Sequence, residues 1–392
     1  MQRKKQLSTI GYTAFLFATI VLYCAVCTFT MDDVRLYSLF LGDFSIGICS
    51  RFLIGSIISV FKDVITREWL LSFLRVITFS VFLITAHYLG STLTKAEKDY
   101  KIPLVFFAGL FIACPFSITV YAGDIFGFID VFCAIVLLMT AYFSENKILI
   151  WSAPVLMIAG VFIHDSFITG YMAPCLGIIA YIAVTKYGKK LWTSAIFIIS
   201  SLAGILTSIY TVFFSRKTLR MNTDEVLRYL AKKGNTTVDD ISGYIEDSVM
   251  WEDIHNVAPD GIEKKPVNYI YYSIKVAIDD LCLEDLLAVI SIIPIIALVF
   301  YVWIKAIQKS STPYEKIPYI LFMLTPVPQI ISLFMSNDFT RFLSTIVFTQ
   351  VIYLFLTIRA KDKKTVDALK QFRTTPQMYL PACLSVLIMN IV

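Results

Sequence analysis

Long apolar runs, separated by short polar joins, dominate the pattern of this chain. A membrane-spanning helix needs about 20 consecutive, mostly apolar residues. By this criterion the pattern predicts about eleven spans, of which the last is short: residues 9–30, 69–91, 103–121, 126–143, 148–164, 167–185, 191–214, 284–304, 317–335, 340–358 and 376–392. We therefore expect an all-α fold, a polytopic bundle of transmembrane helices that forms a single domain over residues 1–392.

The composition supports a membrane protein and argues against a soluble one. Hydrophobic residues make up 57% of the chain and charged residues only 16%, whereas soluble domains carry about 25% charged residues. The net charge of +5 comes from short basic clusters between apolar runs, so it does not indicate nucleic-acid binding. The eight Cys residues lie mostly inside apolar runs, without CxxC spacing, and predict small packing residues rather than metal ligands or disulfides.

The basic clusters predict the topology. If the amino terminus is cytoplasmic, the clusters fall on one side of the membrane, as the positive-inside rule requires. They lie at residues 3–5, 95–101, 147, 186–190, 305–316 and 359–373. The long mixed-charge loop at residues 215–267 falls outside, and long loops follow this rule poorly.

Two external segments have helical patterns of their own. Within residues 31–68, "SRFLIGSIISVFKDVITREW" is apolar but too short to span before Lys62 and Asp63, so it predicts an interfacial helix. Within residues 215–267, "DEVLRYLAKKG" and "DDISGYIEDSVMWEDI" predict short amphipathic helices, the first ending at Gly234. We expect this long loop to form a lid over the outer end of the bundle.

The predicted topology gathers the ionisable residues at the outer joins. Such groups are costly at membrane depth, so they tend to face water or each other. We therefore predict a polar cavity that opens outward. Its candidate residues are Asp32, Asp33, Arg35, Arg51, Asp124, Asp130, His164, Asp165, Asp338 and Arg341.

Each candidate also has a simpler structural interpretation. Asp165 or Ser166 fits as the cap of the sixth span, and Asp338 fits as the cap of the tenth, paired with Arg341 three residues on. The acidic pair 32–33 fits a solvated loop, and the arginines in segment 31–68 fit local ion pairs with nearby Asp residues. The sequence alone leaves both interpretations open.

Three short motifs resemble known families. The acidic pair Asp32 and Asp33, in the first external loop, resembles the arrangement in polytopic glycosyltransferases of the GT-C superfamily. The run "SENKILIWSAPVLMIAGVFIHDSFITGYMAP" resembles the EpsG-like and Wzy-like polysaccharide polymerases, with Lys147, His164, Ser166 and Pro174 in the same order. "NDFTRFL" is similar to a motif near the end of such chains. These families commonly carry an Arg in the span before the His motif, where this chain has Asp124 and Asp130.

The resemblance implies a membrane glycosyltransferase or glycan polymerase at the outer face of a bacterial inner membrane. Its partners would be membrane lipid and a sugar carried on polyprenyl phosphate or diphosphate. Asp32 or Asp33, and next His164, would remove the acceptor proton. The phosphate would be held by Arg35, Arg51 or Arg341. We expect no tightly held cofactor or metal, although an acidic pair such as this one can also hold a divalent cation.

Two other functions remain open. A transporter or flippase for an anionic or lipid-linked substrate would use the same arginines without bond chemistry, and would show broken spans in matching halves. Only "MLTPVPQ" at residues 323–329 looks broken. A surface receptor or phage-exclusion protein would place its function mainly in loop 215–267.

Overall fold

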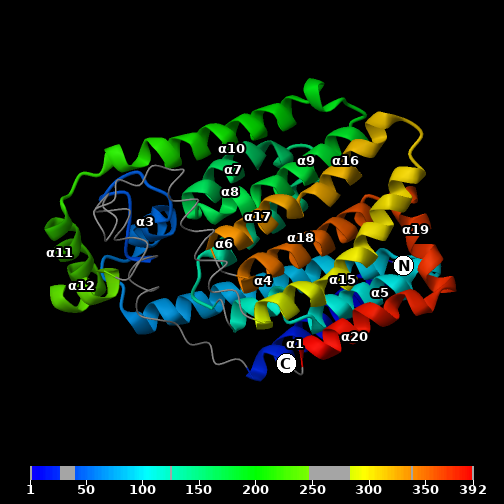
Figure 1. Cartoon of the computed structure of the whole chain (residues 1–392), viewed down its shortest axis with the longest axis horizontal. Coiled ribbons are helices and arrows are strands. Elements are labelled where there is room, and N and C mark those ends of the chain that lie inside the picture. Colours follow the sequence, from blue (N-terminus) through cyan, green and yellow to red (C-terminus); the bar gives the residue numbers. More distant parts are fainter. Residues whose placement is uncertain (1, 27–39, 124–125, 247–282, 337–338, 391–392) are drawn as a thin grey trace.

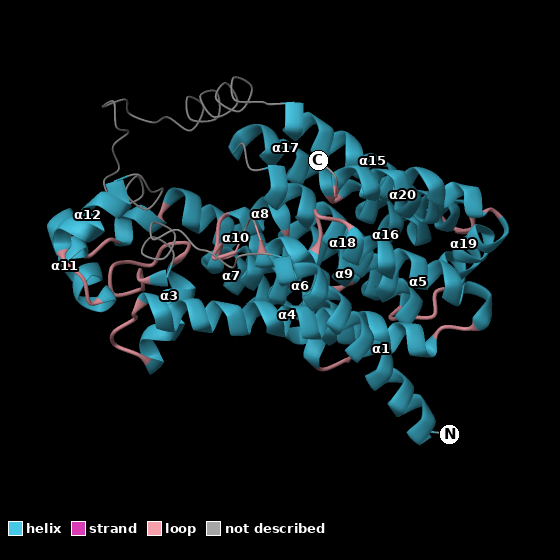
Figure 2. Ribbon diagram, turned by 90° about the horizontal axis from the view of Figure 1, so that it is seen from below, coloured by secondary structure: helices cyan, strands magenta, loops and turns pink. Residues whose placement is uncertain are grey.

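The computed structural model describes the chain except for residues 1, 27–39, 124–125, 247–282, 337–338 and 391–392. The described residues form helices and connecting loops, with no strand among them. Most helices run along the long axis of the molecule (Figure 1), and the same arrangement is seen from below (Figure 2). The all-α prediction is therefore confirmed for this part of the chain.

Seventeen α-helices and six short 3-10 helices make up the described fold. The α-helices are α1 (Gln2–Tyr23), α3 (Phe52–Phe61), α4 (Arg67–Lys95), α5 (Lys98–Ala113), α6 (Asp130–Phe143), α7 (Ala153–Ile163), α8 (Ser166–Gly170), α9 (Met172–Thr185), α10 (Ala195–Phe213), α11 (Thr223–Gly234), α12 (Val238–Glu246), α15 (Leu283–Gln308), α16 (Pro313–Leu324), α17 (Pro326–Ser336), α18 (Phe339–Arg359), α19 (Lys363–Thr374) and α20 (Leu380–Met389). The 3-10 helices are η1 (Cys24–Val26), η2 (Ile118–Ala122), η3 (Leu149–Ser152), η4 (Leu191–Thr193), η5 (Ser215–Thr218) and η6 (Pro376–Tyr379).

Seven described helical segments are long and apolar enough to cross a membrane. They are Gln6–Tyr23, Arg67–Lys95, Lys98–Ala122, Ala195–Phe213, Leu286–Gln308, Pro313–Leu333 and Phe339–Arg359. Each coincides with a predicted span. The predicted spans at 126–143, 148–164, 167–185 and 376–392 contain shorter apolar helices. Because α6, for example, is only about 21 Å long, against a hydrocarbon core of about 30 Å, the count of eleven stays a prediction.

Helix α18 lies at the centre of the bundle. It packs against α4, α5, α6, α15, α17 and α19, and every residue of its most apolar window is buried within the protein. The buried side chain of Gln350 accepts a hydrogen bond from Trp303 Nε1 (2.9 Å) and donates one to the carbonyl of Phe322 (2.7 Å). A polar group inside a membrane needs such internal partners, so α18 is adapted to a protein environment rather than to lipid.

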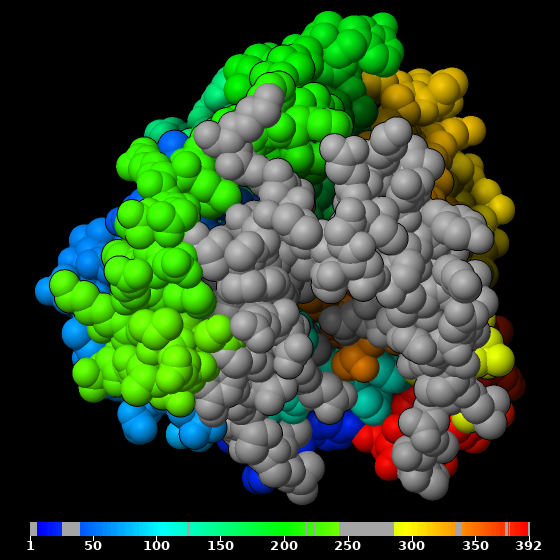
Figure 3. Space-filling view, turned by 60° about the vertical axis from the view of Figure 1, so that its left-hand side comes forward, coloured from blue at the N-terminus to red at the C-terminus, as the bar shows by residue number. Residues whose placement is uncertain are grey.

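The structure has a helix at each of the two predicted places, α3 and α11, while the interfacial position of α3 stays a prediction. The buried carboxylate of Asp43 joins them, because it accepts a hydrogen bond from Ser59 Oγ of α3 at 3.0 Å and contacts two residues of α11, Lys233 Nζ at 2.6 Å and the Tyr229 hydroxyl at 2.5 Å. Gly55 is required in α3, since a Cβ there would lie 1.9 Å from the carbonyl oxygen of Gly42. Figure 3 shows α11 and α12 beside α3 at one end of the molecule.

Helix α11 ends close to the predicted position. Gly234 is its last residue, and Asn235 adopts the left-handed conformation (φ 54°) that ends the helix. Residues 215–246 of the predicted lid are described, and α11 packs toward α3. Whether the whole of residues 215–267 acts as a lid stays a prediction, because part of it lies outside the described residues.

Ion pairs join several basic loops at the other end of the bundle. Lys370 lies 3.6 Å from Asp99, and Lys309 lies 3.0 Å from Asp367. These pairs link α19 to the start of α5 and to the end of α15, in stretches that the sequence assigns to one side of the membrane. The grouping agrees with the expected alternation of joins, while the cytoplasmic orientation stays a prediction.

Candidate functional site

The structure describes half of the candidate site residues. Arg51, Asp130, His164, Asp165 and Arg341 are described, and they lie close together at one end of the bundle. The other candidates lie outside the described residues: Asp32, Asp33, Arg35, Asp124 and Asp338.

The sequence FIHDSF forms a tight turn between α7 and α8. Asp165 is the N-cap of α8, and its carboxylate accepts a hydrogen bond from the Ser166 N–H at 3.1 Å. The turn depends on Gly160, because a Cβ there would lie 2.4 Å from the ring of Phe167. The capping interpretation of Asp165 is thus confirmed, and the same residue also takes part in a wider network.

His164 is buried in this turn, with 5% of its surface exposed. Its Nδ1 atom lies 2.8 Å from Asp165 Oδ1 and 2.8 Å from the Ser166 backbone nitrogen. A protonated Nδ1 donates to the carboxylate, whereas an unprotonated Nδ1 accepts from the backbone N–H. The ring therefore has a stabilising partner on this nitrogen in either protonation state.

Arg51 reaches the turn from the start of α3. Its guanidinium Nη2 lies 3.0 and 3.2 Å from the two carboxylate oxygens of Asp165. Its backbone has φ 75° and donates from N–H to the carbonyl of Phe162 at 3.0 Å. A non-glycine residue persists in this strained conformation only where its surroundings fix it, and such residues cluster at functional sites.

These neighbours determine the charge of Asp165. Desolvation alone would raise the pKa of this carboxyl, but the Arg51 guanidinium and the His164 ring hold its pKa well below the ordinary value of 3.8. Asp165 therefore stays ionised at neutral pH. Its carboxylate contacts both Arg51 and His164, so it is placed to orient these two side chains.

Asp130 and Arg341 form the second half of the network. Asp130 begins α6, is 1% exposed, and accepts a hydrogen bond from Ser166 Oγ at 3.0 Å. Arg341 Nη1, from the first turn of α18, lies 3.7 Å from the other carboxylate oxygen. The Arg341 guanidinium also lies over the rings of Phe128 (5.5 Å) and Phe342 (5.1 Å).

Ser166 connects the two halves, because its N–H faces His164 and Asp165 while its hydroxyl binds Asp130. We refer to these residues as the outer network: Arg51, Asp130, His164, Asp165, Ser166 and Arg341. It brings two guanidinium groups and one imidazole, from three separate parts of the chain, to one place. The expected Asp338–Arg341 pair lies partly outside the described residues, whereas the Asp130–Arg341 approach was not foreseen.

The sequence analysis also missed the hydroxyl groups beneath the network. Tyr121 and Tyr171 share a hydrogen bond of 2.5 Å, and Thr345 Oγ1 donates to the Tyr171 hydroxyl at 3.3 Å. All three side chains are buried. Their sequence signal was weak, since Tyr and Thr are ordinary residues in apolar helices, and only the fold shows that they meet.

No group of three or more His, Cys, Asp and Glu side chains that could hold a metal ion is found in the part of the chain described. Asp32 and Asp33 lie outside that part. The divalent-cation alternative at this acidic pair therefore stays a prediction.

Comparisons of the chain with family models, curated proteins and solved structures gave no match. The fold itself defines a coarse class: an all-helical protein, with several apolar helices suited to a membrane. Within that class, the function has to be inferred from the geometry of the outer network.

Proposed function

We propose that this chain is a membrane glycosyltransferase or glycan polymerase, which uses sugars carried on polyprenyl phosphate or diphosphate at the outer face of a bacterial inner membrane. The observation that supports this most is one connected network that contains two arginines and a buried imidazole: Arg51 pairs with Asp165 beside His164, and Arg341 approaches Asp130, which Ser166 links to the same turn. Arg is the side chain best suited to binding phosphate through paired hydrogen bonds. A proton acceptor in one network with two such groups fits the transfer of a sugar away from a phosphate.

The chemistry assigns a role to each group. An acceptor hydroxyl attacks the anomeric carbon, a new C–O bond forms, and the bond from that carbon to the phosphate oxygen breaks. The electron pair leaves with the phosphate, whose charge Arg51 and Arg341 stabilise. The hydroxyl proton passes to His164, whose Nε2 makes no hydrogen bond to any described residue, or to Asp32 or Asp33.

The test is the size profile of the surface glycan in a deletion strain that carries wild-type or variant protein. We expect Arg341→Ala and His164→Ala to abolish the long-chain ladder while short units remain. Arg228→Ala, which removes an exposed guanidinium from α11, is the matched control and should restore the full ladder. An unchanged ladder in the deletion strain itself would contradict a polymerase.

One observation favours a second candidate, a transporter or flippase for an anionic or lipid-linked substrate. Two apolar segments are interrupted, one at residues 164–171 between α7 and α9, the other at Thr325 between α16 and α17. The interruptions meet, because Gln329 Nε2 on α17 donates to the carbonyl of Gly170 at 2.6 Å. Broken helices that meet are typical of transporter binding sites.

The two functions separate in reconstituted vesicles. A transferase joins a purified lipid-linked sugar to an acceptor present on the same side of the membrane. A flippase moves that lipid to the opposite leaflet without changing its mass. Movement of the intact lipid, with no glycosidic product, would replace the transferase proposal by this second candidate.

A further inference from the structure

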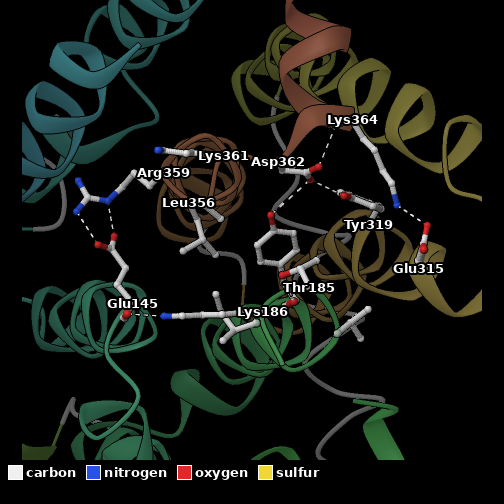
Figure 4. A pocket seen from close by; sticks show the side chains of 14 residues that line it. Glu145, Thr185, Lys186, Glu315, Tyr319, Leu356, Arg359, Lys361, Asp362 and Lys364 are labelled. Atoms are coloured by element: carbon white, nitrogen blue, oxygen red, sulfur yellow. Dashed lines mark hydrogen bonds and ion pairs between the residues drawn. The ribbon is translucent and has the colours of Figure 1, made fainter. Parts of the chain in front are cut away.

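A polar cavity of about 670 Å³ lies at the opposite end of the bundle, and we refer to it as the inner cavity. α9, α16, α18 and the joins at Glu145 and Lys361–Lys364 contribute its lining. Figure 4 shows the charged side chains around it. Arg341 of the outer network and Arg359 of the inner cavity lie on one helix, about 27 Å apart, so the two sites are separated by nearly the thickness of a bilayer core.

Two cations of the inner cavity are already neutralised. Arg359 makes a two-pronged contact with Glu145, with Nη2 2.9 Å from Oε2 and a second contact through Nε. Lys364 Nζ lies 2.7 Å from the carboxylate of Glu315. Both pairs are drawn as dashed lines in Figure 4.

Two further cations are not neutralised. Lys186 Nζ donates to main-chain carbonyl oxygens of Ser144 and Glu145, which carry no net charge. Lys361 is exposed and makes no ion pair with any residue that the structure describes. Its backbone is left-handed, with φ 57°. The carboxylate of Asp362 also lines the cavity and accepts hydrogen bonds from the hydroxyl groups of Tyr181, Tyr319 and Thr365. The lining thus has four basic and three acidic side chains, a net charge of +1, and its two ammonium groups without a carboxylate partner among the described residues are those of Lys186 and Lys361.

An apolar groove of about 660 Å³ lies next to this cavity, between α1, α4 and α6. Its walls include Leu83, Ile84, Ile135 and Leu138, and the exposed side chains of Leu83 and Ile84 belong to a helix long enough to cross a membrane. The stretch of α6 from Ile135 to Phe143 is about 12 Å long, close to the ~15 Å of one leaflet's hydrocarbon.

The cavity and the groove share a wall. Tyr142 lines the groove, and its ring centre lies 5.7 Å from the Arg359 guanidinium carbon. Glu145, one helical turn further along the chain, lines the cavity and binds Arg359. A molecule with a charged head and an apolar chain could thus place the head beside the cavity lysines and the chain in the groove.

We propose that this pair of sites binds an anionic glycerophospholipid of the adjacent leaflet. Its phosphate would lie between Lys186 and Lys361, and one acyl chain would follow the groove past Leu83 toward Ile135. The charge complementarity and the position of the groove on α4 both favour a lipid already present in the membrane. This proposal does not depend on sugar transfer at the outer network.

The test measures the thermal midpoint of the purified full-length protein in detergent while phosphatidylglycerol is added. The apparent affinity for this lipid should fall about thirtyfold in the double variant Lys186→Gln/Lys361→Gln, since each Lys near an anionic headgroup contributes about fivefold. The control is Lys189→Gln/Lys190→Gln, on the same join but outside the cavity lining, and it should bind as the wild type does.

A second variant tests the groove. Leu83→Trp fills it and should weaken phosphatidylglycerol binding, whereas Ile102→Trp, at an exposed position on α5 outside the groove lining, should not. Equal stabilisation by phosphatidylcholine, or by glycerol phosphate without acyl chains, would overturn the proposal. So would equal affinity in the cavity and control lysine variants, or an unchanged affinity in Leu83→Trp.

Discussion

The two ends of α6 and α18 carry different kinds of polar site. At the outer end, Asp130 and His164 are nearly inaccessible, Asp130 is bound by Ser166 from another helix, and His164 is bound within its own turn. At the inner end, the charges surround an open cavity, and Lys186 and Lys361 have no carboxylate partner among the described residues. The outer arrangement suits proton transfer and precise orientation, whereas the inner one suits the binding of a ready-made anion. Basic side chains therefore suit different tasks at the two ends, depending on whether they are buried and whether a carboxylate neutralises them.

The largest expected effect comes from breaking the buried pair at the outer end. Arg341→Ala leaves the carboxylate of Asp130 without its nearby cation, which should lower the free energy of unfolding by about 3 kcal/mol and abolish long-chain glycan. Asp130→Asn/Arg341→Gln removes both charges, so it should recover most of the stability but not the product. Chemical unfolding in detergent and the glycan ladder measure the two effects separately. Recovery of product in the double variant would show that Arg341 has only a structural role.

Arg51 allows backbone strain to be separated from charge. Arg51→Gly tolerates the left-handed backbone (φ 75° in the native chain) but removes the guanidinium, whereas Arg51→Lys keeps a charge but lacks the planar guanidinium and its further N–H donors. We expect product loss in both, on the order of 100-fold for Gly and less for Lys, since removing one charge-stabilising donor costs about that factor. Comparable stability of Arg51→Gly and wild type, combined with lost product, would place the role of Arg51 in the reaction. Full product from Arg51→Gly would exclude it.

The corresponding change at the inner end should lower stability without affecting glycan length. Glu145→Gln weakens the contact with Arg359, whose side chain is 8% exposed, and should cost about 2 kcal/mol, as for a hydrogen bond to a charged group. The glycan ladder should stay at wild-type length, because the change lies about 27 Å along α18 from Arg341. A shortened ladder at normal protein abundance would show that the two ends are coupled.

The smallest effect concerns the attachment of α11 and its dependence on pH. Burial opposes ionisation of Asp43, but the hydrogen bond from Lys233, followed by that from Tyr229, lowers its pKa below the ordinary value of 3.8. A carboxyl with a lowered pKa stabilises the fold above its unfolded pKa, and this contribution is lost as the pH falls through the folded value. Hydrogen exchange of α11 should therefore increase only at pH values below about 3.8, the ordinary pKa. In the Asp43→Asn variant, the hydrogen exchange of α11 should be faster than in the wild type already at pH 7. If the protection of α11 in the wild type does not change with pH, ionisation of Asp43 does not control the attachment of α11.

The sequence predicted the helices far better than the contacts between them. Apolar runs predicted each of the seven long apolar helices among the described residues, because hydrophobic length is a property of one segment. The signals for α3 and α11 were local as well. Helix α19 was missed, because its few large apolar residues, the partly buried Val366 and the buried Leu369 and Phe372, lie within a highly charged join.

The site required information that no single segment contains. His164 and Asp165 stood out because they interrupt apolar sequence, and the fold places them together with Arg51 and Arg341. The partner of Asp130 could not be read from the chain, since the two residues are separated by several helices. The sequence analysis did not predict the inner cavity, because the positive-inside rule already explained the positions of its lysines.

The central position of α18 has a consequence for how the protein is made. The ribosome delivers the segments from the amino terminus onward, so nearly all the helices that surround α18 enter the membrane before it does. Gln350 finds its hydrogen-bonding partners on α15 and α16, which are themselves late segments. The earlier helices therefore enter the membrane before the central helix that they pack against is present. Insertion of α18 then completes the bundle and brings Arg341 next to Asp130.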